Sequence, residues 1–185
     1  MIAVRTFVSQ NQIVIRSAGK KPEFEQWTAK NREMGMIWHP GYIVLDPLVE
    51  GSFNAFFLIK EADTIHIDQN SQRSALIPFE ITDLNECCIS TVSEIIFLTR
   101  NVTVDLEREK KRSRFYPVNT ASDFVLEEGT YVLHFQVCIG WSAEFDSDTE
   151  EVYYRFDFIK EANPEFKVLI DDDYGWNSST SLIKE

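Results

Sequence analysis

The chain has 185 residues, of which 44% are hydrophobic and 13% aromatic, and this favours one globular domain spanning residues 1–185. Thirty acidic residues against 18 basic ones give a formal net charge of -12, which disfavours direct nucleic-acid binding because the phosphate backbone is also negative. No apolar run approaches the roughly 20 residues of a membrane-spanning helix, and no signal peptide is visible, so we expect a cytoplasmic protein.

Short runs rich in β-branched and aromatic residues recur along the chain and predict strands. Several of them alternate with period two, which is typical of strands with one face in the core and the other in solvent. Many short strands predict an all-β fold, mainly an antiparallel β-sandwich. In chain order the predicted strands are Ile2–Val8, Gln12–Arg16, Tyr42–Asp46, Asn54–Lys60, Ala75–Ile81, Glu86–Thr91, Glu94–Leu98, Val102–Leu106, Thr130–Ile139, Val152–Ile159 and Phe166–Ile170.

One short helix is predicted near the N-terminus, over Pro22–Met34. Pro22 suits the first turn of a helix, and Gly35 suits its C-terminal stop. One stripe of this helix, which we expect to pack against the sandwich, contains Phe24, Trp27, Asn31 and Met34. At the other end of the chain, residues 177–185 are polar and predict a frayed tail.

Patterns that indicate catalysis or a resident cofactor are missing from the sequence. His39, His66 and His134 are far apart, no pair of His or Cys residues has metal-ligand spacing, and the seven glycines never cluster into a phosphate-binding loop. No Gly-x-Ser-x-Gly motif for a nucleophile is present either. We therefore expect neither an enzyme, nor a metal, nor a cofactor; an active site assembled only in space is the alternative that sequence leaves open.

Acidic residues accumulate toward the C-terminus, where residues 141–185 contain 12 acids against 4 bases. Aromatic residues interleave with these acids, and carboxylates around aromatic anchors suit a surface that meets Arg and Lys on a partner protein. The alternative is a β-sandwich binding module whose acidic loops hold calcium or a small ligand. The candidate partner-binding residues are Trp141, Glu144, Asp146, Asp148, Glu150, Glu151, Asp171, Asp172, Asp173 and Trp176.

Five segments stand out by their order and spacing: Phe24-Glu-Gln-Trp-Thr28, Ile37-Trp-His-Pro-Gly-Tyr-Ile-Val44, Asn54-Ala-Phe-Phe-Leu-Ile59, Ile77-Pro-Phe-Glu-Ile81 and Leu126-Glu-Glu-Gly-Thr-Tyr-Val-Leu-His-Phe-Gln-Val137. Together they resemble the competence-associated nuclease inhibitors, the competence protein J or Nin family. The resemblance covers about residues 10–159, and the chain departs from the family in a polar insertion at 107–123 and an extension after Lys160. It implies a protein that binds and inhibits a DNA-uptake nuclease or, by analogy, a toxin nuclease against which it is the immunity protein.

The net charge is compatible with what this resemblance implies. A nuclease groove is basic because it holds phosphate, so an acidic protein can occupy it by imitating the charge of the nucleic acid. We therefore expect a basic nuclease, or another nucleic-acid-processing protein, as the partner, and we expect the acids between Glu144 and Glu151 to meet it, with Trp141 and Trp176 as anchors.

Overall fold

The computed structural model describes residues 1–9, 12–17, 35–47, 53–83, 87–98, 116–118 and 126–170, and these residues form strands and connecting segments without any helix. The predicted helix at Pro22–Met34 and the predicted strand at Val102–Leu106 lie outside the described residues. The strands are β1 (Ile2–Val8), β2 (Ile13–Arg16), β3 (Met36–His39), β4 (Tyr42–Leu45), β5 (Phe53–Glu61), β6 (Ser71–Ile81), β7 (Cys88–Ser90), β8 (Glu94–Phe97), β9 (Tyr116–Val118), β10 (Gly129–Gly140), β11 (Glu151–Lys160) and β12 (Lys167–Ile170).

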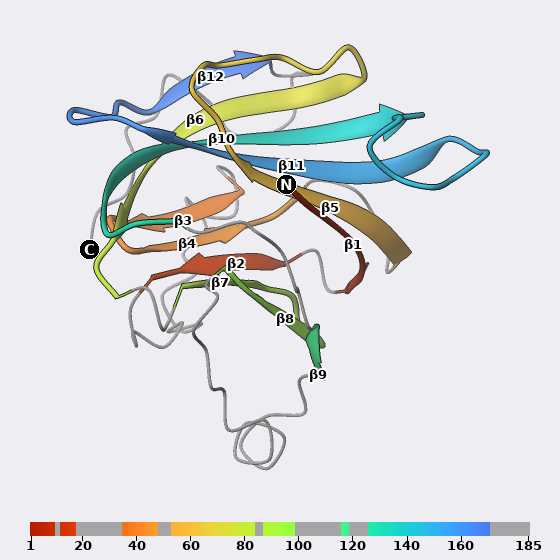
Figure 1. The fold of residues 1–185 in the computed structure, drawn as a ribbon, viewed down its shortest axis with the longest axis horizontal. Coiled ribbons are helices and arrows are strands. Elements are labelled where there is room, and N and C mark those ends of the chain that lie inside the picture. The colour runs from red at the N-terminus through yellow and green to blue at the C-terminus, as the bar shows by residue number, and fades with distance from the viewer. Residues whose placement is uncertain are drawn as a thin grey trace.

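The strands form two six-stranded sheets that lie one above the other in Figure 1. The first sheet has the order β1-β5-β11-β10-β6-β12, and the second has the order β3-β4-β2-β7-β8-β9. Neighbouring strands are antiparallel except for β5 with β11 and β8 with β9, which are parallel. The expected all-β, mainly antiparallel fold is therefore confirmed.

One hydrophobic core fills the space between the two sheets. The first sheet contributes side chains such as Phe57, Leu133 and Phe156, and the second contributes Ile15 and Ile43; all five are fully buried. Each comes from a strand with many β-branched or aromatic residues, which pack well on a pleated surface. Burial of these side chains between the sheets is the main stabilising contribution to the fold.

The outer face of the first sheet is exposed at β1, where Ala3, Arg5 and Phe7 lie, but it is buried over the middle of β10 and β11. The expectation of one solvated face per strand is therefore wrong for β10 and β11. The polar side chains of His134, Gln136, Arg155 and Asp157 alternate with the core residues, yet none is more than 4% exposed. The connecting segment 62–70 makes contacts with this layer. Residues 62–70 hydrogen bond to Gln136, whose Oε1 accepts from the Asp68 backbone NH at 2.9 Å and whose Nε2 donates to the His66 carbonyl at 3.1 Å.

Two strands were missing from the prediction. The four residues of β3 are consecutively apolar or aromatic and lie beside a Pro40-Gly41 turn, so they lack the alternation that reveals a half-buried strand. The three residues of β9 fall in the polar segment 107–123, where a strand this short gives no periodic signal.

Among the described residues, no helix has the length and apolar character needed to cross a membrane.

Candidate functional site

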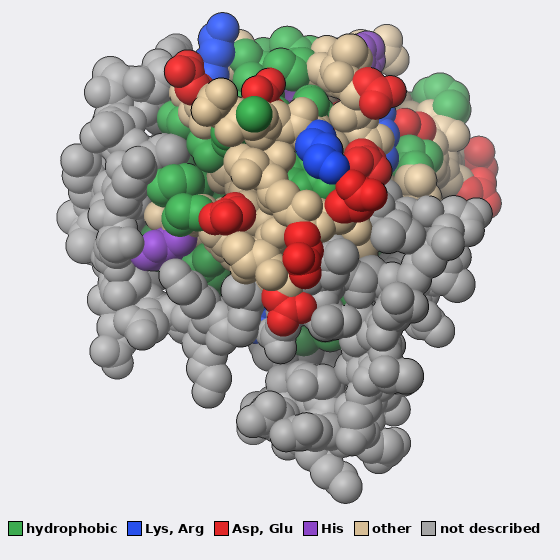
Figure 2. Space-filling view, turned by 60° about the vertical axis from the view of Figure 1, so that its left-hand side comes forward, with side chains coloured by type: hydrophobic (Ala, Val, Ile, Leu, Met, Phe, Trp, Pro, Cys, Tyr) green, Lys and Arg blue, Asp and Glu red, His purple; other side chains and the backbone are tan. Residues whose placement is uncertain are grey.

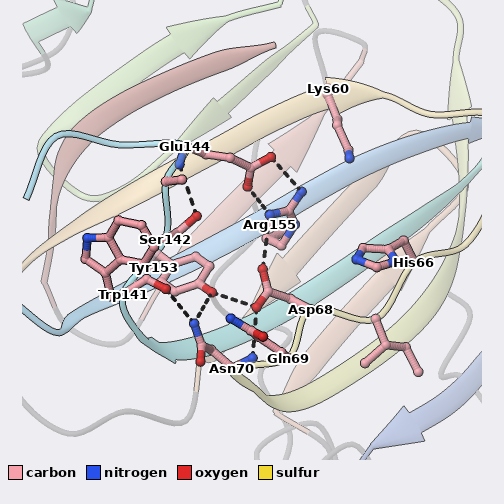
Figure 3. A pocket seen from close by; sticks show the side chains of 12 residues that line it. Lys60, His66, Asp68, Gln69, Asn70, Trp141, Ser142, Glu144, Tyr153 and Arg155 are labelled. Atoms are coloured by element: carbon pink, nitrogen blue, oxygen red, sulfur yellow. Dashed lines mark hydrogen bonds and ion pairs between the residues drawn. The ribbon is translucent and has the colours of Figure 1, made fainter.

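A pocket of about 460 Å³ lies where the segment 62–70 meets the segment that follows β10. Figure 3 shows its labelled side chains, with Trp141, Ser142, Tyr153 and Asn70 toward one end, and Lys60 and His66 toward the other. The pocket thus joins parts of the chain that are about seventy residues or more apart in sequence, and it borders the acidic segment 141–150, here called the hairpin loop because it connects β10 to β11.

The guanidinium of Arg155 forms the centre of the pocket wall. It pairs with the Glu144 carboxylate of the hairpin loop through two hydrogen bonds, and its Nη1 donates to Asp68 Oδ2 at 3.1 Å. A third carboxylate, Asp157 on the same strand, lies 3.9 Å from Arg155 Nε. Burial disfavours the charged form of Arg155, but the hydrogen bond to Glu144 and the surrounding negative charges outweigh it and raise its pKa. Arg155 therefore remains a cation that links two loops to the sheet.

A second set of hydrogen bonds positions Trp141 at the same pocket. Tyr153 donates its hydroxyl proton to Asp68 Oδ1 at 2.7 Å and accepts from Asn70 Nδ2 at 3.0 Å, while Asn70 Nδ2 also donates to the Trp141 carbonyl at 2.8 Å. Gly140 makes room for this amide. A Cβ there would lie 2.6 Å from Asn70 Cγ, and its φ of 154° is one that L side chains rarely adopt.

The hairpin loop makes contacts along its length, both within itself and with neighbouring strands. The Phe145 ring stacks on Phe56 of β5 with 4.3 Å between centroids. Trp141 Nε1 donates to the Ser147 carbonyl at 2.9 Å, and Ser147 Oγ donates to Glu151 Oε1 at 3.0 Å. Arg5 of β1 pairs with that same Glu151 oxygen at 2.9 Å. These contacts connect the loop to β1, β5 and β11.

The predicted partner-binding acids of this loop divide into two groups. Glu144 and Glu151 point inward and are paired with Arg155 and Arg5. Asp146, Asp148 and Glu150 are exposed, and none forms an ion pair with another described residue. These three, here called the outward acids, face solvent. The predicted residues Asp171, Asp172, Asp173 and Trp176 lie outside the described residues.

Acidic side chains are not confined to the hairpin loop. Figure 2 shows Asp and Glu in several separate groups on the visible face, with Lys and Arg beside some of them. At the opposite end of the β10–β11 pair, Glu61, Asp63 and Glu128 are exposed, and Glu127 pairs with Lys160 at 2.7 Å. Negative charge alone therefore does not distinguish the hairpin loop as a candidate binding site. The neighbouring pocket and the exposed side chain of Trp141 distinguish it.

Three residues under segment 62–70 have the types of a catalytic triad. Ser74 Oγ lies 2.7 Å from His134 Nε2, and Asp157 is the cross-strand neighbour of His134. The Asp157 oxygens and His134 Nδ1 nevertheless lack a hydrogen bond, all three side chains are buried, and neither Ser74 nor His134 lines the pocket. A nucleophile needs a base oriented by a third group and access to substrate, and neither condition holds here. Within the described part of the chain, no three His, Cys, Asp or Glu side chains are grouped to hold a metal ion.

The sequence did not reveal Arg155, Asp68, Asn70 or Tyr153 as site residues. The sequence did contain a signal for Arg155, because it is a charged residue among the aromatic residues of the strand segment Tyr153–Phe158. If both faces of that strand are buried, the charge of Arg155 needs partners inside the protein. Its pairing with Asp68 spans 87 residues and depends on how segment 62–70 crosses the sheet. That crossing has no local sequence signature.

Residues 5–159 match the family model described as Competence protein J (ComJ). The chain belongs to the ComJ family. This confirms the resemblance found in the sequence, and the matched range includes the pocket and the whole hairpin loop, whereas Asp171–Asp173 lie beyond it.

A solved structure with a similar fold is that of ComJ from Bacillus subtilis, described as an inhibitor of the DNA-degrading activity of NucA. The TM-score is 0.54 at 17% sequence identity, and the alignment covers 87% of this chain and 96% of that one. A comparison with curated protein sequences gives no match. The ComJ fold is thus retained where most side chains have changed.

Proposed function

We propose that this protein is a nuclease inhibitor that acts by binding and performs no reaction itself. Membership of the ComJ family and the activity stated for the similar Bacillus subtilis protein support a nuclease as the partner. The observation that carries the proposal is the hairpin loop, which is joined to the sheet through Glu144 and Glu151 while its outward acids have no ion-pair partner among the described residues.

The mechanism follows from the charge of the two proteins. A nuclease needs a basic groove to hold the phosphates of its substrate, so the outward acids speed its encounter with this protein and then occupy positions that phosphates would take. Trp141, exposed at the base of the loop, adds an aromatic contact of the kind that dominates many interfaces. Inhibition is then competitive with nucleic acid and weakens as salt screens the charges.

The test compares two triple variants that lose the same three negative charges at opposite ends of β10 and β11. One is Asp146→Asn with Asp148→Asn and Glu150→Gln; the control is Glu61→Gln with Asp63→Asn and Glu128→Gln. Association with the cognate nuclease is measured by stopped flow at low salt. We expect the hairpin-loop triple to slow association roughly tenfold, and the control triple to change it less than about twofold, because steering depends on where the charge lies. Equal effects of the two triples would contradict the proposed contact surface.

The setting we propose is cytoplasmic, with either a DNA-uptake nuclease or a toxin nuclease as the target. Co-purification from the native host, followed by a nuclease assay with and without this protein, identifies which one is inhibited. A melting experiment with millimolar calcium tests the alternative of a cation-binding module, since a ligand of the folded state must raise the midpoint. We expect no calcium-dependent rise. A captured nuclease whose activity is unchanged would refute the inhibitory function.

A further inference from the structure

Exposed apolar side chains accumulate on the two segments that border the pocket. Trp141 is 54% exposed on the hairpin loop, and Ile65 and Ile67 are 50% and 43% exposed on segment 62–70. Trp141 and Ile67 line the same pocket. An apolar centre with charged residues around it is the arrangement found in protein interfaces whose central contacts carry most of the affinity.

The charges inside this pocket are already compensated within the protein. Arg155 is held between Glu144 and Asp68, and Lys60, at the end of the pocket away from Trp141, is the cross-strand neighbour of the buried carboxylate of Asp157. The pocket interior therefore has little preference for a cation or an anion. What it offers an incoming group is the indole of Trp141 and the side chain of Ile67.

The two segments behave as one preformed surface. Arg155 bridges them through Asp68 and Glu144, and Asn70 donates to the Trp141 carbonyl at 2.8 Å. Because the segments are fixed before binding, little conformational entropy is lost when a partner contacts both of them. A contact to Ile67 therefore belongs to the same binding event as a contact to Trp141.

We propose that residues 65–70 and the hairpin loop form a single interaction surface, called the two-loop surface, and that the partner binds across the pocket and contacts Ile67 and Trp141 with apolar or aromatic side chains. This inference rests on the proposed function, because the occupant is the basic nuclease. Charge complementarity favours it over a second copy of this chain, which would bring two sets of outward acids, Asp146, Asp148 and Glu150, face to face. Sequence analysis did not assign segment 65–70 to the interface.

The test substitutes one exposed apolar residue at the surface and one elsewhere. Ile67→Ser removes the contact, and Val92→Ser is the matched control, since Val92 is 37% exposed on the loop between β7 and β8. Both variants keep the net charge. We expect Ile67→Ser to accelerate dissociation from the nuclease by about tenfold with the association rate unchanged within about twofold, because the loss is a short-range contact and no steering charge is removed. Val92→Ser should leave both rates unchanged.

The outcomes separate this inference from the proposed function. If Ile67→Ser dissociates as slowly as Val92→Ser while the protein still inhibits the nuclease, the two-loop surface is refuted and the inhibitory function stands. If the unaltered chain neither binds nor inhibits the nuclease, the proposed function is refuted, and this inference, which rests on it, is refuted with it. A concentration-dependent dimer in analytical ultracentrifugation that Ile67→Ser abolishes would assign the surface to a second copy and overturn the inference.

Discussion

Replacing His134 by glutamine perturbs the buried polar layer on the outer face of the first sheet. His134 is fully buried, its Nε2 lies 2.7 Å from Ser74 Oγ, and its Nδ1 has no hydrogen-bond partner. Burial, followed by the charges of Arg155, His66 and Lys60, lowers its pKa to about 4 from 6.5. The folded protein therefore keeps this imidazole neutral where an unfolded chain protonates it.

The sign and size of the effect follow from this difference in pKa. A lowered histidine pKa means that the unfolded state binds more protons, so stability is complete above pH 6.5 and falls as the pH drops toward 4. A difference of about 2.5 pKa units corresponds to about 3 kcal/mol. His134→Gln lacks this titration, so we expect its free energy of unfolding to fall by about 3 kcal/mol less than that of the unaltered protein between pH 7 and pH 4.

The assay is urea denaturation at pH 7, 6, 5 and 4, followed by circular dichroism. Carboxylates titrate in both proteins, so the difference between the two unfolding free energies isolates His134. His39→Gln is the matched control because His39 is a histidine that is not among the groups that lower the pKa of His134, so the fall in stability caused by His134 should persist in this variant. A constant difference between His134→Gln and the unaltered protein across this pH range would refute the assignment of His134 as a neutral buried group.

Two further predictions concern the conformation of the hairpin loop. Gly140→Ala places a Cβ 2.6 Å from Asn70 Cγ at a φ of 154°, so we expect a loss of about 1–3 kcal/mol of stability in chemical denaturation, together with weaker nuclease inhibition. Gly129→Ala serves as its control, since Gly129 has a similar φ of 148° but its nearest neighbouring atom, Lys160 Cε, would lie 4.0 Å from the added Cβ; this variant should lose less stability and leave inhibition unchanged. Phe145→Ala removes a buried ring that stacks on Phe56 at 4.3 Å and should cost about 3 kcal/mol, measured in the same way. An unchanged unfolding free energy for Phe145→Ala would mean that the loop is not anchored by this ring.

Much of the fold was predictable because period-two patterns are local. The predicted strands Thr130–Ile139 and Val152–Ile159 agree within one residue at each end with β10 and β11. Strand pairing was not predictable, since the parallel pairing of β5 with β11 joins segments almost a hundred residues apart. The burial of both faces of β10 follows from that pairing and from the path of segment 62–70, which has no periodic signal.

Only part of what the structure shows around the predicted binding residues could be read from the sequence. The sequence indicated the acidic run from Glu144 to Glu151 and the adjacent Trp141, and the structure puts a pocket beside them. It could not indicate which acids face inward, because Glu144 is held by Arg155 and Glu151 by Arg5, and these pairs depend on tertiary contacts. Whether the outward acids contact a partner stays a prediction until the rate measurements are made.

In the hairpin loop, the residues that maintain its shape differ from those that face solvent, and this makes the loop suitable for engineering. Phe145, Glu144 and Glu151 maintain its shape, whereas Asp146, Asp148 and Glu150 contribute nothing to that shape among the described contacts. We expect these three positions to accept new side chains without loss of folding. Libraries varied there, with the inward residues fixed, should yield binders whose target changes while their melting temperature does not.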